Sequence, residues 1–319
     1  MHTDSRPGIA LVTRPTRMRN LLHRWSTRGA AKFAILAAHR AQRAQTAESE
    51  LRQVEEWAAA EFQDLEQEDA LYEEVVRRLQ SELNFGLPVQ LVDREFLPNF
   101  DFSRFEVVVV VGQDGLVANA AKYVGAVPIV AVNPDPRRFD GVLLPFQVNQ
   151  ARGSVERVLK NRFRERSVTL AEVKLQDGQR LLAFSVLFFG AATQVSARYT
   201  LRTDSGCESQ SSSGMIISTG AGSTGWLSSV LNMACGVAHS LGATVANRPK
   251  LDWEDRALLW TVREPFVSRM SRAELVFGRL EENSTLVVES NMAAGGVIFS
   301  DGVESDYLQF NNGTIAVVE

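Results

Sequence analysis

Short, mostly apolar runs in the first half of the chain predict strands, several of them buried on both faces. They are Ile9–Thr13, Pro88–Val92, Phe105–Val111, which contains five consecutive valines, and Val127–Val132. Residues 118–123 favour a helix between the last two strands, so this part of the chain predicts a βαβ unit in a parallel sheet. Ligands bind beyond the carboxyl ends of such strands, where residues 112–116 and 133–136 would lie.

A long helical segment follows the first strand. Between Glu48 and Leu83 apolar residues recur mostly at three- and four-residue steps, as in an amphipathic helix. We expect a solvated helix pair here, within a helical insertion of about residues 14–83. The segment from Arg14 to Arg43 is basic and the next one is rich in Glu, so an alternative is that these opposite charges form a homodimer contact.

Beyond about residue 150 the pattern changes to short strands separated by turn residues. The predicted strands are Leu181–Phe189, Ser196–Arg202, Met215–Thr219, Leu258–Val262, Ala273–Phe277, Thr285–Glu289, Val297–Ser300, Tyr307–Phe310 and Thr314–Val318. Only Trp226–Ser240 predicts a substantial helix, so we expect a mainly antiparallel β domain. The fold class is therefore a Rossmann-like α/β domain, residues 1–148, followed by a β-rich domain, residues 149–319, whose last strands are free to return to the first domain.

Composition narrows the class of partner and the location. The 319 residues carry 34 Lys and Arg against 38 Asp and Glu, a net charge of −4, so no bulk positive field favours a nucleic acid. Two cysteines, Cys207 and Cys235, and four scattered histidines offer neither a disulfide framework nor metal-ligand spacing. No apolar run approaches the roughly 20 residues of a membrane span. The early basic segment has transit-peptide character, but the core strand at Ile9–Thr13 argues against its removal, so we expect a cytoplasmic protein.

A glycine turn at the end of the valine strand is the first candidate site. Gly112 and Gly115 let the backbone bend sharply and bring N–H groups close to an anion, and the following helix adds its positive end. Asp114 stands between them, and a carboxylate beside bound phosphates needs a cation or a proton-transfer role. Asp114 is thus a candidate Mg²⁺ ligand or general base. Alternatively, Asp114 caps the helix of an ordinary Asp-Gly turn.

A second glycine-rich turn, residues 218–226, lies between a strand and the predicted helix. Its phosphate-binding candidates are Thr219, Gly220, Gly222, Ser223, Thr224 and Gly225. Taken as GxGxxG, the turn suggests a dinucleotide-binding fold, but no acidic residue follows from Gly225 to Leu251 to hold a ribose. Hydroxyls and glycines that open a helix suggest instead a phosphate or ribose cradle. Trp226 would then stack on a base or pack in the core.

The two turns, in this order and at this separation, resemble those of the NAD kinase family, whose members carry GGDGT after a buried strand and a TPTGSTAYS-like turn in a β-rich second domain. Here residues 112–116 are GQDGL and residues 218–226 are STGAGSTGW. The turn Asn133-Pro134-Asp135-Pro136 is most similar to the mitochondrial-type branch, as are Val262–Pro265 and the segment from Ser300 to Thr314. The similarity spans nearly the whole chain.

The resemblance implies transfer of the γ-phosphoryl group of ATP to the adenosine-ribose 2′-hydroxyl of NAD, which gives NADP. It implies that Asp114 orients and deprotonates that hydroxyl, and that Mg²⁺ and backbone N–H groups carry the phosphate charge. It also implies that Asn133 lies among the nucleotide-binding residues, and that Thr224, Gly225 and Trp226 contact the nucleotide.

Three departures from the family pattern leave other functions open. Gln113 replaces a glycine and Leu116 replaces the motif threonine. The Asn-Glu pair of the family, which hydrogen-bonds NAD, falls on Ser185 and Val186, so most of that hydrogen-bonding capacity is lost. The alternatives are a pseudokinase that binds nucleotides without turnover, or a kinase of another hydroxyl acceptor, a lipid or a sugar.

Overall fold

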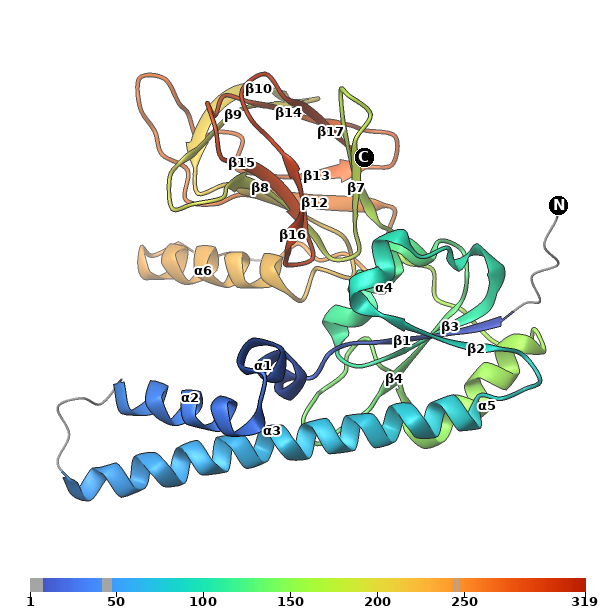
Figure 1. The fold of residues 1–319 in the computed structure, drawn as a ribbon. Coiled ribbons are helices and arrows are strands. Elements are labelled where there is room, and N and C mark those ends of the chain that lie inside the picture. Colours follow the sequence, from blue (N-terminus) through green and yellow to red (C-terminus); the bar gives the residue numbers. More distant parts are fainter. Residues whose placement is uncertain (1–7, 42–47, 244, 246) are drawn as a thin grey trace. The chain divides into compact units, whose positions relative to one another are not determined.

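The computed structural model describes residues 8–41, 48–243, 245 and 247–319. The chain forms two compact units, Met1–Phe163 and Arg164–Glu319, whose elements are labelled in Figure 1. His2, Arg43 and the side chain of Leu51, which belong to patterns noted in the sequence, lie outside the described part.

The first unit is built on a five-stranded sheet with the order β2-β1-β3-β4-β5. The strands are β1 (Gly8–Thr13), β2 (Val89–Asp93), β3 (Phe105–Val111), β4 (Ile129–Asn133) and β5 (Phe146–Gln147). Every pairing is parallel, and the five valines of β3 are fully buried. The α/β fold class predicted for this part of the chain is confirmed.

Helices cover both faces of this sheet. They are α3 (Glu48–Glu82), α4 (Asp114–Val124) and α5 (Val148–Leu159), with the short 3-10 segments η1 (Arg94–Asn99) and η2 (Phe102–Arg104). α3 and α5 share an apolar cluster with one face of the sheet, whereas α4, η1 and η2 share a cluster with the other face. The connection after β1 therefore leaves in the opposite direction to the connection after β3. The carboxyl ends of β1 and β3 form the topological switch point, where open α/β sheets bind ligands.

The helical insertion differs from the expected helix pair. It consists of α1 (Arg17–Trp25), α2 (Arg28–Ala41) and α3, which runs as one helix of 35 residues. No glycine or proline interrupts residues 48–82, so nothing in that stretch ends the helix. α2 lies along the outer half of α3 (Figure 1), and the two are joined by the buried residues Ala31, Phe62 and Leu65.

The opposite charges of the insertion pair within one chain. Arg19 bonds Glu73 at 2.9 Å, and Arg28 bonds Glu66 at 3.3 Å. These are exposed pairs, each of which contributes little to stability. Their presence nevertheless means that the charge complementarity that suggested a homodimer is used inside the chain.

The second unit is a sandwich of two six-stranded antiparallel sheets around one apolar core. One sheet has the order β10-β9-β14-β17-β6-β7, with β6 (Ala171–Leu175), β7 (Arg180–Ala183), β9 (Ala197–Thr203), β10 (Gly206–Ser212), β14 (Leu286–Ser290) and β17 (Ile315–Val318). The other has the order β13-β12-β11-β8-β15-β16, with β8 (Val186–Ala191), β11 (Met215–Ser218), β12 (Ala257–Val262), β13 (Phe277–Glu281), β15 (Gly296–Ser300) and β16 (Val303–Gln309). The predicted helix α6 (Trp226–Ser240) packs its first turns on the outer face of this second sheet. The β-rich second part of the fold class is confirmed.

Some elements of the second half differ from the sequence prediction. The predicted strand Leu181–Phe189 is two strands, broken at residues 184–185, and β13 starts at Phe277, where the strand predicted at Ala273–Phe277 would have ended. β6, β10 and α5 were not predicted. β16 pairs with β15, and β17 pairs with β14 and β6, so the last strands stay in the second unit and do not return to the first.

Candidate functional site

The first glycine turn lies at the switch point of the parallel sheet. Gly112 directly follows β3, and Asp114 is the first residue of α4. A Cβ at Gly112 would stand 2.8 Å from Cδ2 of Leu116 and 3.7 Å from Cδ of Arg14, so the turn is closely packed at this residue. Leu116 is buried beneath the turn in the apolar cluster. Gly115 is exposed and has open space around it.

The carboxylate of Asp114 is half-buried and ties the turn to a nearby loop. Its Oδ1 accepts a hydrogen bond from the backbone N–H of Leu143 at 2.6 Å. Asp114 therefore uses an oxygen across to residue 143 and does not act as the N-cap, a position that Gln113 occupies without a side-chain hydrogen bond. An ionised carboxylate has about four acceptor sites, so this bond leaves capacity for a hydroxyl or a cation.

Asn133 is connected to the same loop. It ends β4 and is buried, its Nδ2 donates to the carbonyl of Phe139 at 2.9 Å, and its Oδ1 accepts from the N–H of Asp135 at 3.0 Å. Both ends of the amide thus hold the turn that follows β4. A Cβ at Gly141 would lie 2.6 Å from Nδ2 of Asn133, so the loop that reaches Asp114 also packs on Asn133. The two candidate residues are brought together through residues 141–143.

The second glycine turn is hydrogen-bonded to residues 184 and 185, which directly follow β7. Thr219 is fully buried, and its hydroxyl donates to the carbonyl of Phe184 at 2.6 Å and accepts from the N–H of Gly222 at 3.2 Å. Its own N–H donates to the carbonyl of Ser185 at 3.1 Å. The hydroxyl of Ser223 donates back to the carbonyl of Thr219 at 3.2 Å. These bonds give the turn one defined shape.

Two glycines of this turn are required by close backbone packing. A Cβ at Gly220 would stand 1.9 Å from the carbonyl oxygen of Asp252, and a Cβ at Gly222 would stand 2.0 Å from that of Ser185. Thr224 and Gly225 are exposed at the start of α6, where helix N–H groups favour anions. Residues 219–222 therefore form the buried base of the turn, and residues 224–225 form its exposed part.

Ser185 and Val186 lie against this second turn. Their backbone is held by hydrogen bonds to Asp301, a residue that the sequence did not single out. Oδ1 of Asp301 accepts from the N–H groups of Ser185 and Val186 at 2.7 and 3.0 Å, and its Oδ2 accepts from Phe184 at 2.9 Å. Asp301 itself has a positive φ of 53°. The side chain of Val186 is buried against α6, so it cannot replace a polar substrate contact. Asp301 was noted only as part of a resemblance, because nothing local reveals a contact across 116 positions.

Trp226 packs inside the second unit. Its ring stacks on Phe188 with centroids 5.5 Å apart and an interplanar angle of 14°. The guanidinium of Arg263 lies 5.0 Å from its centroid, a cation–π distance. Of the two roles expected for Trp226, packing in the apolar cluster is the one that these contacts describe.

A cavity of about 360 Å³ opens beside the second turn. It is lined by Arg166, Gly220, Thr224, Lys250, Leu251, Asp252, Trp253 and Glu254. The guanidinium of Arg166 lies 5.1 Å from the ring centroid of Trp253. A larger cavity of about 590 Å³ is lined by residues such as Glu106 and Pro128 at the amino ends of β3 and β4. That end is about 20 Å from Gly112 along the strand, so the larger cavity is not part of the candidate site.

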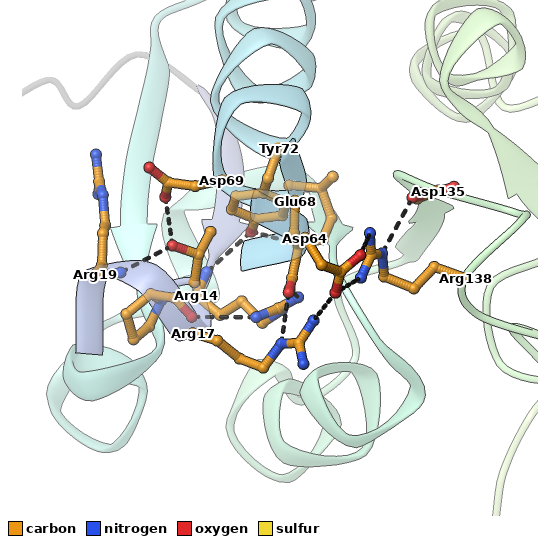
Figure 2. Close-up of polar contacts among 12 residues, drawn as sticks. Arg14, Arg17, Arg19, Asp64, Glu68, Asp69, Tyr72, Asp135 and Arg138 are labelled. Carbon is orange, nitrogen blue, oxygen red and sulfur yellow. Dashed lines mark hydrogen bonds and ion pairs between the residues drawn. The ribbon is translucent and has the colours of Figure 1, made fainter. Parts of the chain in front are cut away.

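Charged side chains crowd the carboxyl ends of β1 and β4, and Figure 2 shows that they are already paired. Arg14, just after β1, donates to Glu68 of α3 at 2.9 Å. Arg138, in the turn after β4, bonds both oxygens of Asp64 at 2.7 and 2.8 Å. The hydrogen bonds from Arg138 and its positive charge lower the pKa of Asp64, and the hydrogen bonds to Asp64 and its negative charge raise the pKa of Arg138. Burial alone would raise the pKa of Glu68, but the bonds from Arg14 and Arg17 outweigh burial and lower it.

The described residues can be searched for a metal-ion site and for a membrane-spanning helix. Among them, no group of three or more His, Cys, Asp or Glu side chains is placed to hold a metal ion. Mg²⁺ commonly keeps waters and takes one or two carboxylates plus substrate phosphates, so Asp114 fits an ion that arrives with a nucleotide and not a resident one. In the same part of the chain, no helix is both long and apolar enough to span a bilayer.

Comparison with known proteins identifies the fold. A crystal structure of yeast NADH kinase complexed with NADH aligns with 99% of this chain and 80% of its own, with a TM-score of 0.55 and 16% identity. An NAD kinase from Archaeoglobus fulgidus in complex with ATP aligns with 76% of this chain and 85% of its own, with a TM-score of 0.53 and 17% identity. The chain has the NAD kinase fold. No protein-family model matches the sequence, and no curated protein matches it significantly.

Proposed function

We propose that the protein is a member of the NAD kinase family that transfers the γ-phosphoryl group of ATP to the adenosine-ribose 2′-hydroxyl of NAD. The observation that carries this proposal is the position of Asp114. It is the first residue of α4, beyond β3 at the switch point of an NAD kinase fold, where a carboxylate can meet both a helix N-terminus and a substrate hydroxyl.

In this reaction Asp114 accepts the proton of the 2′-hydroxyl. The hydroxyl oxygen forms a bond to the γ-phosphorus while the bond from phosphorus to the β–γ bridging oxygen breaks, and ADP leaves. The hydrogen bond that Oδ1 accepts from the N–H of Leu143 would hold the carboxylate in place and leave Oδ2 to accept this proton. Mg²⁺ bound to ATP would neutralise the phosphate charge. Backbone N–H groups of residues 113–115, at the start of α4, would hold the phosphates.

One observation favours a second candidate function. Ser185 and Val186 stand where the family has Asn and Glu, and their N–H groups are occupied by Asp301. A site built to hydrogen-bond a substrate discriminates strongly against analogues that lack the matching group. The loss of that pair therefore supports a nucleotide-binding pseudokinase, or a kinase whose acceptor is a lipid or sugar hydroxyl.

The first prediction tests the proposed base. With NAD, ATP and Mg²⁺ the wild type should form NADP, and Asp114→Asn should lower kcat by about 10²–10⁴-fold while the melting temperature stays close to that of the wild type. Asp177→Asn, at an exposed turn, is the matched control and should retain the wild-type rate.

Each contrary outcome of that assay selects an alternative. Nucleotide binding by calorimetry without NADP formation would identify the pseudokinase, and ATP turnover only with another acceptor would identify a different hydroxyl kinase. Wild-type turnover by the Asp114→Asn protein would refute the proposed role of that carboxylate.

We also propose a cytoplasmic location and retain a homodimer as a hypothesis. Because the charges of the insertion are paired within one chain, charge complementarity gives no separate support for the dimer. Light scattering of the purified protein decides between the monomeric mass of 35.2 kDa and twice that value.

A further inference from the structure

One face of the inserted helix α3 contacts the ends of three strands of the parallel sheet. Asp64, Glu68 and Tyr72 are four residues apart, so they share a face of the helix. Asp64 bonds Arg138 after β4, Glu68 bonds Arg14 after β1, and Tyr72 bonds the last residue of β3. Figure 2 shows these side chains converging from α3 on the carboxyl edge of the sheet.

The hydroxyl of Tyr72 spans the switch point between β1 and β3. It accepts a hydrogen bond from the backbone N–H of Arg14 at 3.0 Å and donates one to the carbonyl of Val111 at 2.8 Å. The ladder between these strands ends at the pair Val12 and Val110, so Tyr72 satisfies the next polar groups, which would otherwise need water or a ligand. Burial raises the pKa of Tyr72 to about 12, so the hydroxyl keeps the proton that it donates.

Glu68 holds the side chain that supports the glycine turn. Its Oε1 accepts from Arg14 at 2.9 Å and its Oε2 accepts from Arg17 at 2.6 Å. The side chains of Arg14 and Glu68 are 11% and 5% exposed, and Cδ of Arg14 lies against Gly112. Glu68 is therefore hydrogen-bonded to Arg14, whose side chain lies next to Gly112, and Tyr72 is hydrogen-bonded directly to Val111.

We propose that Tyr72 and Glu68 are positioning residues, which hold the Gly112–Gly115 turn in the geometry that presents Asp114 and the helix N-terminus to a nucleotide. This inference rests on the proposed kinase function. Arg14, Arg17 and Arg138 are already paired with three carboxylates, those of Asp64, Glu68 and Asp135. These arginines therefore act here as supports and not as phosphate ligands. The insertion is thus a working part of the site, although it contributes no group to the reaction.

The decisive experiment removes the phenolic oxygen of Tyr72 from the 319-residue protein by a single substitution. Tyr72→Phe keeps the ring and its packing but leaves the Arg14 N–H and the Val111 carbonyl without their partner. We expect amide hydrogen exchange in residues 111–116 to become about tenfold faster, with exchange in β12 unchanged. In the NADP assay, kcat should fall about tenfold while KM for NAD stays constant. Tyr307→Phe, at an exposed tyrosine of the second unit, is the control and should change neither value.

A second variant covers the case in which Tyr72→Phe does not fold. Glu68→Gln preserves the shape of the side chain but removes its charge, and it should also accelerate exchange in residues 111–116 and lower kcat. Unchanged exchange in both folded variants would overturn the proposal. Higher activity in either variant would also overturn the proposal, because it would mean that α3 blocks the switch point. If the wild type makes no NADP, the proposed function fails, while the exchange measurement still decides whether α3 positions the turn.

Discussion

At the residue scale, the glycines of the second turn are not equivalent to other glycines of the same unit. A Cβ at Gly222 would collide with a backbone carbonyl at 2.0 Å, whereas a Cβ at Gly236, within α6, would meet nothing within 4 Å. A backbone atom cannot rotate away as a side chain can. The first glycine is therefore needed for close approach, and the second only weakens a helix.

The two positions predict substitutions of opposite sign. Gly222→Ala should lower the free energy of unfolding by about 1–3 kcal/mol through overpacking, and Gly236→Ala should raise it by about 0.5–1 kcal/mol through helix propensity. Urea denaturation followed by circular dichroism measures both. Equal stability of Gly222→Ala and the wild type would mean that residues 184–186 can move away from the turn.

At the element scale, α3 combines an apolar face with a charged one, and its charged face makes the protein sensitive to acid. The pKa values of Asp64 and Glu68 are lowered by their arginine partners. A carboxyl with a lowered pKa in the folded state stabilises that state above the unfolded pKa, and the contribution disappears as the pH falls through the folded value. The relevant window starts at the ordinary values of 4.5 for Glu and 3.8 for Asp and extends below them.

The free energy of unfolding should therefore change little between pH 7 and about pH 5 and fall below that range. Glu68→Gln should be less stable than the wild type at neutral pH, and its stability should depend less steeply on pH in the acid range. Glu74→Gln, at an exposed position on the same helix, should leave the pH profile as it is. Denaturation curves at a series of pH values make the comparison, and parallel profiles for the wild type and Glu68→Gln would contradict it.

Elements whose burial follows from local pattern could be predicted from the sequence, and elements held by distant polar contacts could not. The valines of β3 were predicted correctly because they are buried in a core. The bounds of α6 were also predicted correctly, although Leu227 is its only buried residue. β10 was missed because its buried positions, Glu208, Gln210 and Ser212, are all polar. The carboxylate of Glu208 accepts hydrogen bonds from the N–H groups of Glu274 and Leu275. The role of Asp301 was missed for the same reason. A carboxylate of this kind accepts hydrogen bonds from residues far away in the sequence.

At the scale of the whole molecule, the two units have separate cores. The core of the second unit is formed between its own two sheets, and all strands of these sheets lie after Arg164. Residues 164–319 expressed alone should thus fold, with a β-type circular dichroism spectrum and one cooperative thermal transition. A non-cooperative transition would show that the second unit depends on the first, and the full-length chain is the reference.

The spacing of Asp64, Glu68 and Tyr72 on one face of α3 limits where residues can be inserted into or deleted from this helix. Successive residues of a helix are rotated by about 100°, so one residue added between Asp64 and Tyr72 would turn one of these two side chains away from the sheet. Residues 52–60 of α3 precede that stretch. The helical hairpin formed by α2 and α3 could lengthen or shorten there without altering the spacing from residue 64 to residue 72. Homologous chains should accordingly differ in the reach of the hairpin while they keep the eight-residue interval from the first of these contacts to the last.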